Sequence, residues 1–158
     1  MVYPLLLALH NLNRWLVSGV GIWSALFVTY GWLSKRLWTS QHTFWVRLFA
    51  WIGAVQFVLG LFLYLLPGAF IQSLLQNMAW AQIMKDRLLR FFTLEHPTTM
   101  LIAIVVANIA AATARRVERE RERFAWTAIL LILALVLILG TIPWPGSSYA
   151  RPWLRWPF

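Results

Sequence analysis

Four long apolar runs, separated by short polar stretches, constrain this chain more than any other feature. They occupy residues 4–34, 43–66, 94–114 and 124–142. A helix of about 20 apolar residues spans the hydrocarbon core of a bilayer, and a helix satisfies its backbone hydrogen bonds without help from water. The sequence therefore predicts an all-α, integral membrane four-helix bundle that forms a single domain over residues 1–158.

The composition supports a membrane protein and excludes several other classes. Hydrophobic residues make up 61% of the chain and charged residues 12%, whereas soluble domains are about half apolar and a quarter charged. The net charge of +9 is explained by arginines that flank the spans and meet anionic lipid headgroups, so we expect no nucleic-acid partner. The chain has no cysteine, which excludes disulfides, iron–sulfur clusters and covalent haem attachment through thiols.

The segments outside the apolar runs have their own patterns. Residues 70–92 alternate apolar and polar positions, which predicts an interfacial amphipathic helix between spans two and three. The tail, residues 143–158, is rich in proline and tryptophan, and we expect it to be extended, with its tryptophans at headgroup level. The opening residues lack a basic segment and a cleavage site, so they are expected to begin the first span rather than a signal peptide.

Basic residues indicate an orientation in the membrane. Eight of the fourteen Lys and Arg residues fall in the loops 35–47 and 115–123, which share one side. Cytoplasmic loops carry an excess of such residues. We therefore expect a multi-pass protein of the bacterial inner (cytoplasmic) membrane with both termini in the periplasm.

The three histidines lie near the ends of the apolar runs. Because the chain reverses at each crossing, His10 and His96 should lie near one membrane face and His42 near the other. Two histidines on different helices at similar depth are what a membrane-embedded haem b requires, so His10 and His96 are the candidate metal ligands. The alternative is that each is a polar residue at a helix end, and Pro97 after His96 is typical of a helix start.

Polar residues near this pair are candidates for cofactor binding. Arg14 lies one turn after His10, and Arg90 precedes His96; both are candidate partners for haem propionates. Glu95 is expected to orient His96, pair with Arg90 or relay a proton. Gln56 is expected to bridge helices, or to bind a quinone together with His96 and Arg14.

No motif indicates hydrolase or nucleotide chemistry. The chain has no Gly-rich phosphate loop, no nucleophile elbow and no HExxH sequence. Whether the protein is an enzyme is left open by its sequence.

Several short motifs resemble a family of small four-helix bacterial membrane proteins, common in Bacteroidetes and labelled cytochrome b-like. The shared patterns are H-x-x-x-R-W from His10, R-F-F-T-x-E-H-x-x-x-M from Arg90, and I-P-W-P from Ile142. The resemblance implies haem b and electron transfer, and the matching positions are His10, Arg14, Arg90, Glu95 and His96. Pro97 and the extended Trp-rich tail depart from the family pattern, and the tail offers a contact surface for partners.

Two functions are expected from these features. The first is a b-type haem protein that transfers electrons, with quinol or quinone as its partner. The second is a non-catalytic accessory subunit of a respiratory or photosynthetic membrane complex that binds lipid or quinone. Either form can belong to a larger complex or a homo-oligomer. A transporter is a third, weaker reading, because the chain has no internal repeat and few polar residues inside its spans.

Overall fold

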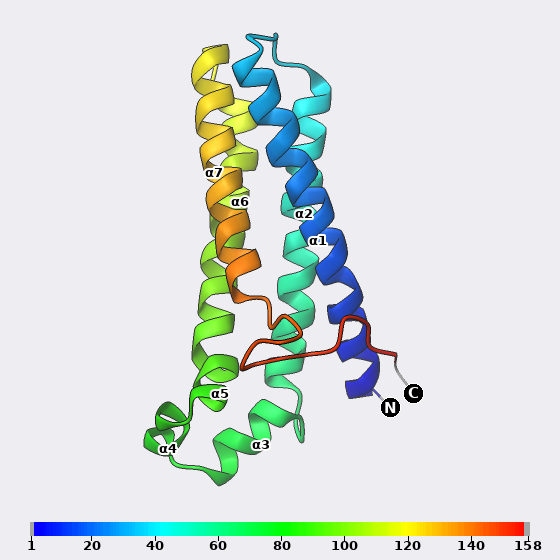
Figure 1. The fold of residues 1–158 in the computed structure, drawn as a ribbon, viewed down its shortest axis with the longest axis vertical. Coiled ribbons are helices and arrows are strands. Elements are labelled where there is room, and N and C mark those ends of the chain that lie inside the picture. The colour runs from blue at the N-terminus through cyan, green and yellow to red at the C-terminus, as the bar shows by residue number, and fades with distance from the viewer. Residues whose placement is uncertain (1, 157–158) are drawn as a thin grey trace.

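Four long antiparallel helices form the body of the protein (Figure 1). The structure, a computed structural model, describes residues 2–156. Each long helical segment is long and apolar enough to cross a membrane, so the all-α class and the multi-pass membrane character are confirmed. The long helices are α1 (Val2–Leu33), α2 (Ser40–Leu65), α6 (His96–Arg116) and α7 (Glu120–Thr141).

The helices pack in a ring that follows the chain order. Helix α1 contacts α2 and α7, and α6 contacts the same two neighbours, so α1 and α6 lie diagonally across the bundle. Because the helices alternate in direction, the start of α1 and the start of α6 lie at the same end. Both termini and the tail also lie at this end (Figure 1).

Small residues set the distance between the helices. The buried face of α6 consists of alanines, and Gly21 on α1 packs so closely that an added Cβ would lie 2.6 Å from the Phe49 ring. Lipid tails are as apolar as leucine side chains, so close packing rather than hydrophobicity holds helices together in a bilayer. Large apolar side chains such as Leu26, Trp51 and Val136 are instead exposed on the outer surface.

Residues 66–95 differ from the single interfacial helix that the sequence pattern predicts. They form α3 (Phe70–Asn77), α4 (Trp80–Lys85), α5 (Arg87–Arg90) and a π-helical turn, η1 (Phe91–Glu95). The chain is extended at Met78 and Asp86, and the Asp86 carboxylate accepts a hydrogen bond from the Leu89 N–H at 2.9 Å. This cap starts a new helix. Residues 87–92 therefore belong to a continuous third span, Arg87–Arg116, rather than to the surface segment.

The tail, predicted to be extended, folds back across the bundle and contains several turns. From Ile142 it runs as turns and extended chain across the end that holds the two termini (Figure 1). The Trp153 ring stacks on Trp15 of α1 at 5.5 Å, and Trp144 lies 5.9 Å from the same ring. The sequence predicts a tail over residues 143–158, and residues 157–158 lie outside the part of the chain that the structure describes.

Candidate functional site

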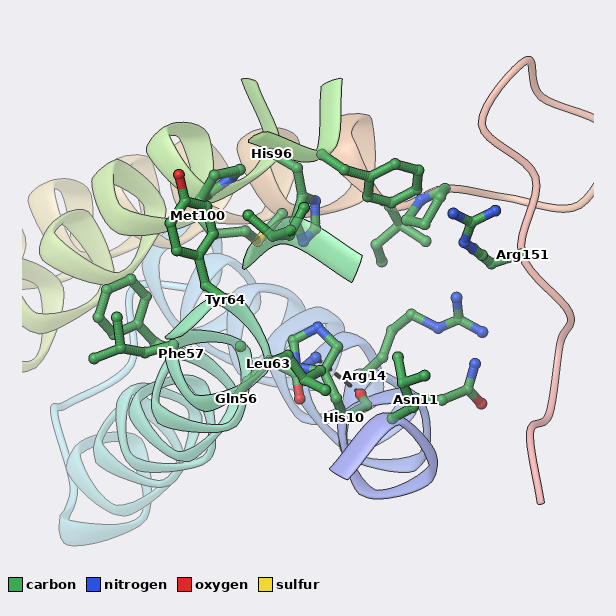
Figure 2. A pocket seen from close by; sticks show the side chains of 18 of the residues that line it. His10, Asn11, Arg14, Gln56, Phe57, Leu63, Tyr64, His96, Met100 and Arg151 are labelled. Atoms are coloured by element: carbon green, nitrogen blue, oxygen red, sulfur yellow. Dashed lines mark hydrogen bonds between the residues drawn. The ribbon is translucent and has the colours of Figure 1, made fainter. Parts of the chain in front are cut away.

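His10 and His96 face each other across the bundle. His10 comes from α1 and His96 begins α6, and their ring centroids are 6.5 Å apart with the ring planes at 73° (Figure 2). His42 lies at the opposite end, where its ring stacks on Phe27 at 4.5 Å and its Nδ1 accepts a hydrogen bond from the Thr39 N–H. These contacts give His42 a role in packing and in capping α2.

A local change in helix geometry precedes His96. The His96 N–H donates to the Phe91 carbonyl, five residues back, which defines the π turn. Single π turns inside α-helices often mark functional sites. Pro97 has no N–H to offer the Thr93 carbonyl, four residues before it, and the Tyr64 hydroxyl of α2 donates to that carbonyl at 3.1 Å. The third span therefore continues through Pro97 with its backbone satisfied by a neighbouring helix.

The end of α7 determines which nitrogen of His96 carries the proton. Nδ1 of His96 lies 3.0 Å from the Thr141 carbonyl. In a continued helix this carbonyl would accept from residue 145, but Pro145 has no N–H. A carbonyl oxygen only accepts, so Nδ1 is the protonated nitrogen and Nε2 keeps its lone pair. Metal-binding histidines are commonly oriented in this way.

His10 is held by the α1–α2 contact. Gln56 on α2 donates from Nε2 to the His10 backbone carbonyl at 2.9 Å and accepts from Asn13 through Oε1, also at 2.9 Å. Gly60 makes room for the ring, since an added Cβ would lie 3.1 Å from Cε1 of His10. Nδ1 of His10 is buried and has no hydrogen-bond partner within residues 2–156. Each of the two imidazoles thus retains an unused nitrogen.

The two histidines lie in the wall of a large cavity. Its volume is about 970 Å³, within the roughly 300–1,000 Å³ range of small-molecule and cofactor sites. Helices α1, α2 and α6 and the tail contribute to it (Figure 2). Phe70, Ile71 and Trp80 of the α3–α4 segment also line it. The wall is mainly apolar and aromatic, and examples are Leu7, Phe57, Leu61, Phe92, Met100 and Ile138.

Arg14 joins the cavity to the tail. It is only 7% exposed, and its Nη2 donates to the carbonyls of Pro152 and Trp153 at 3.2 and 2.9 Å. Its Nε is buried without a partner in the described chain. Arg14 therefore lines the cavity, as expected of a residue predicted to bind a cofactor. Its two hydrogen bonds from Nη2 also hold the tail against α1.

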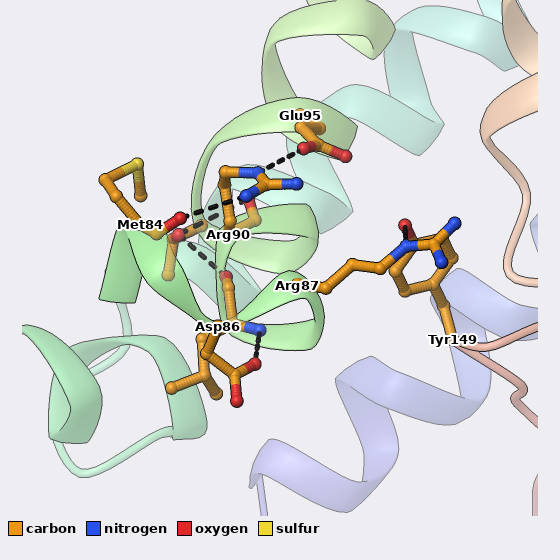
Figure 3. A network of polar contacts seen from close by, with 8 residues as sticks. Met84, Asp86, Arg87, Arg90, Glu95 and Tyr149 are labelled. Carbon is orange, nitrogen blue, oxygen red and sulfur yellow. Dashed lines mark hydrogen bonds and ion pairs between the residues drawn. The ribbon is translucent and has the colours of Figure 1, made fainter. Parts of the chain in front are cut away.

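Arg90 and Glu95 lie away from the cavity. Arg90 Nε pairs with Glu95 Oε1 at 2.6 Å, and its Nη1 donates to the Met84 carbonyl at 3.0 Å (Figure 3). Neither residue lines the cavity wall. Of the three roles predicted for Glu95, the ion pair with Arg90 is the one that the structure contains. Arg90, predicted to bind a propionate, does not line the cavity that holds the histidine pair.

Two arginines of the tail, and not Arg90, line the cavity that holds the histidine pair. Arg151 and Arg155 line the cavity, and the guanidinium of Arg151 lies 4.4 Å from the centre of the Phe92 ring. Sequence reasoning assigned them no site role, because nothing local shows that the tail returns to the bundle. One feature of the sequence could have indicated their role. Arg151 and Arg155 lie among prolines and tryptophans, and a segment so rich in tryptophan is unusual for a solvated tail.

Among the described residues that line this cavity, His10 and His96 are the only His, Cys, Asp or Glu side chains. Within residues 2–156 no group of three or more His, Cys, Asp or Glu side chains could hold a metal ion. A bare ion bound by protein alone commonly takes four or more ligands. Haem iron needs only axial ligands from the protein, so two imidazoles and an apolar cavity match that cofactor better than a bare ion.

Comparison with known proteins found no match for this chain among family models, curated proteins or solved structures. Its function is therefore inferred from the geometry of the site.

Proposed function

We propose that this chain is a b-type haem protein of the bacterial inner membrane that transfers electrons, with His10 and His96 as axial ligands. The observation that carries the proposal is the pair of imidazoles 6.5 Å apart across the bundle. Haem iron is held in proteins by side chains such as histidine. Two imidazoles that face each other from α1 and α6 would hold the group between these helices.

The hydrogen bonds around the rings also support ligation. The Thr141 carbonyl keeps the Nε2 lone pair of His96 available, and Nδ1 of His10 has no partner in the described residues. When bound, haem iron supplies one-electron redox chemistry. The contribution of the chain is to orient the two imidazoles, exclude water with apolar walls and offer cations to the propionates.

A quinone bound between the histidines is less well supported. Each of the two quinone carbonyls needs a hydrogen-bond donor. Of the three predicted donors, His96 already donates to Thr141 and Gln56 already bonds His10 and Asn13, which leaves the Arg14 Nε–H as the buried donor without a partner in the described residues. We therefore assign quinol or quinone the role of redox partner rather than resident ligand. The resemblance to cytochrome b-like proteins implies haem b and electron transfer, and it does not bear on where a quinone binds.

The second candidate is an accessory subunit that binds lipid. The observation that favours it is the apolar wall of the cavity from Phe57 to Leu61 and Phe70, which suits an acyl chain. This candidate predicts a protein that co-purifies with lipid or with a larger complex and has no visible absorbance.

Visible spectroscopy of the detergent-purified protein tests the proposal directly. We expect a reduced-minus-oxidised spectrum of a haem with two axial histidines, and its loss in His10→Ala and His96→Ala. His42→Ala is the matched control, because His42 lies at the opposite end and should leave the spectrum unchanged. Absence of haem from protein made in haem-replete cells, or a normal spectrum in His96→Ala, would refute the proposal.

A further inference from the structure

One end of the cavity has a large excess of positive charge. Arg14, Arg151 and Arg155 line it, and no Asp or Glu does. In the described chain the ion pairs lie elsewhere, between Arg90 and Glu95 and between Arg119 and Glu122. Within residues 2–156, no acidic side chain pairs with these three guanidinium groups.

Because Arg14 is buried, its unpaired positive charge destabilises the protein. A buried charge destabilises a protein unless it is paired or fully hydrogen-bonded. Arg14 is 7% exposed, and its Nε has no partner within residues 2–156. Its two hydrogen bonds to tail carbonyls, both from Nη2, leave the charge itself without an opposite charge.

Arg151 lies in a similar environment from the other side. Figure 2 shows Arg14 and Arg151 directed towards the same side of the cavity, beside the histidine pair. The Arg151 guanidinium lies 4.4 Å from the centre of the Phe92 ring, and within residues 2–156 its side chain donates one hydrogen bond, to the adjacent Ala150 carbonyl at 3.3 Å. Burial, and next the nearby charge of Arg155, lower the pKa of Arg151, although an arginine remains protonated in proteins.

The position of this charge relative to the histidines limits the shape of the ligand. Arg14 lies one helical turn from His10 on the same face of α1. The ligand therefore needs a flat or elongated apolar body between the helices and an anionic group at the tail end. A small inorganic anion would leave the apolar wall uncovered.

We propose that Arg14, Arg151 and Arg155 form a binding site for the anionic group of an amphiphilic ligand, with the tail supplying two of the three cations. This proposal rests on the function proposed above, in which the anionic groups are the two haem propionates. An anionic lipid headgroup would offer the same chemistry. Guanidinium groups bind carboxylate and phosphate well because their donors form a planar fork.

The test compares haem b with its dimethyl ester, in which both propionates are neutral. Each is added to purified haem-free protein, and its rate of loss is measured by transfer to excess apomyoglobin. We expect wild type to retain haem b about tenfold longer than the ester, since hydrogen bonds to charged groups are worth more than neutral ones. In Arg151→Gln/Arg155→Gln this difference should shrink severalfold, because Arg14 is then the one cation of the site that remains.

The control is Arg121→Gln, which removes a positive charge at the opposite end of the bundle. It should retain the preference of wild type for haem b. Arg14 is left unchanged because it also holds the tail through Pro152 and Trp153. Equal retention of haem b and its ester by wild type, or a preference in the double variant as large as that of wild type, overturns the anion site while the histidine-ligated spectrum still stands.

A second measurement separates failure of this site from failure of the haem proposal. If neither haem b nor the ester gives a histidine-ligated spectrum, the proposed function fails. Native mass spectrometry then compares binding of phosphatidylglycerol and phosphatidylcholine. Selective retention of phosphatidylglycerol by wild type, weakened in the double variant, supports the anion site with a lipid as its ligand. Equal retention of both lipids by wild type overturns it.

Discussion

At the scale of single residues, prolines at helix ends decide where side-chain hydrogen bonds go. Pro97, Pro143 and Pro145 each lack a backbone N–H, and in each case the carbonyl four residues earlier accepts from a side chain instead. The resulting donor–acceptor pairs are Tyr64 with Thr93, Trp144 with Leu139, and His96 with Thr141. In lipid an unsatisfied carbonyl is expensive, so these side chains are fixed in place. For His96, this fixes the ring that we propose as a ligand.

The Tyr64 hydrogen bond gives a prediction at this scale. Tyr64→Phe leaves the Thr93 carbonyl without its donor and should lower the free energy of unfolding by about 1–2 kcal/mol. In a Pro97→Ala background residue 97 regains its N–H, so the same substitution should cost much less. Thermal unfolding in detergent of the two single variants and the double variant measures the coupling. Additive effects of the two substitutions would contradict this account of Thr93.

At the scale of helices, glycines and alanines determine how closely the spans approach. Gly21 packs against Phe49 of α2 and Leu135 of α7, and an added Cβ would lie within 2.8 Å of both side chains. Two residues earlier on the same helix, a Cβ at Gly19 would meet nothing within 4 Å. A substitution at Gly21 therefore tests how tightly the helices pack, whereas the same substitution at Gly19 tests only the helix preference of the new residue.

This pair of glycines gives a prediction for the packing of α1. Gly21→Ala should lower the thermal midpoint, because overpacking of a tight core costs about 1–3 kcal/mol. Gly19→Ala should be neutral or stabilising by up to about 1 kcal/mol, since alanine favours a helix. Scanning fluorimetry of both variants in one detergent makes the comparison. A Gly21→Ala protein as stable as Gly19→Ala would show that α1 sits farther from its neighbours.

At the scale of the whole molecule, the antiparallel order places all the candidate chemistry at one end. The cavity, the histidine pair, both termini and the tail share that end, whereas the loops at Lys35 and Glu118 lie at the other (Figure 1). The basic loops favour the second end as cytoplasmic. A redox partner would then approach the cavity from the periplasmic half of the bilayer.

The absence of cysteine from the sequence allows a clean test of this orientation. In whole cells, a membrane-impermeant maleimide should label Ser147→Cys, at the end that holds the tail, without further treatment. Lys35→Cys, at the opposite end, should be labelled only after the membrane is permeabilised. The reverse pattern would place both termini in the cytoplasm and would contradict the orientation, while leaving the histidine pair unaffected.

The positions of the spans and the shared end of His10 and His96 could be predicted because both depend on local properties. Apolar length defines a span, and each short connection reverses the chain. The boundaries of the third span could not be predicted, because Arg87–Arg90 follow an amphipathic pattern and yet join a helix that Asp86 caps. The partner of Gln56 was predicted only as a neighbouring helix, and the structure identifies it as the His10 backbone carbonyl.

The sequence by itself therefore determined the class of the protein, its antiparallel order and its one candidate histidine pair, since each follows from hydrophobicity along the chain. Tertiary structure decided which arginines meet that pair. A helix turns by about 100° per residue, so a π turn between Arg90 and His96 changes their relative direction, and Arg90 pairs with Glu95 instead. Arg151 and Arg155 reach the cavity because the tail folds back onto Arg14 and Trp15, a long-range contact that no local pattern encodes.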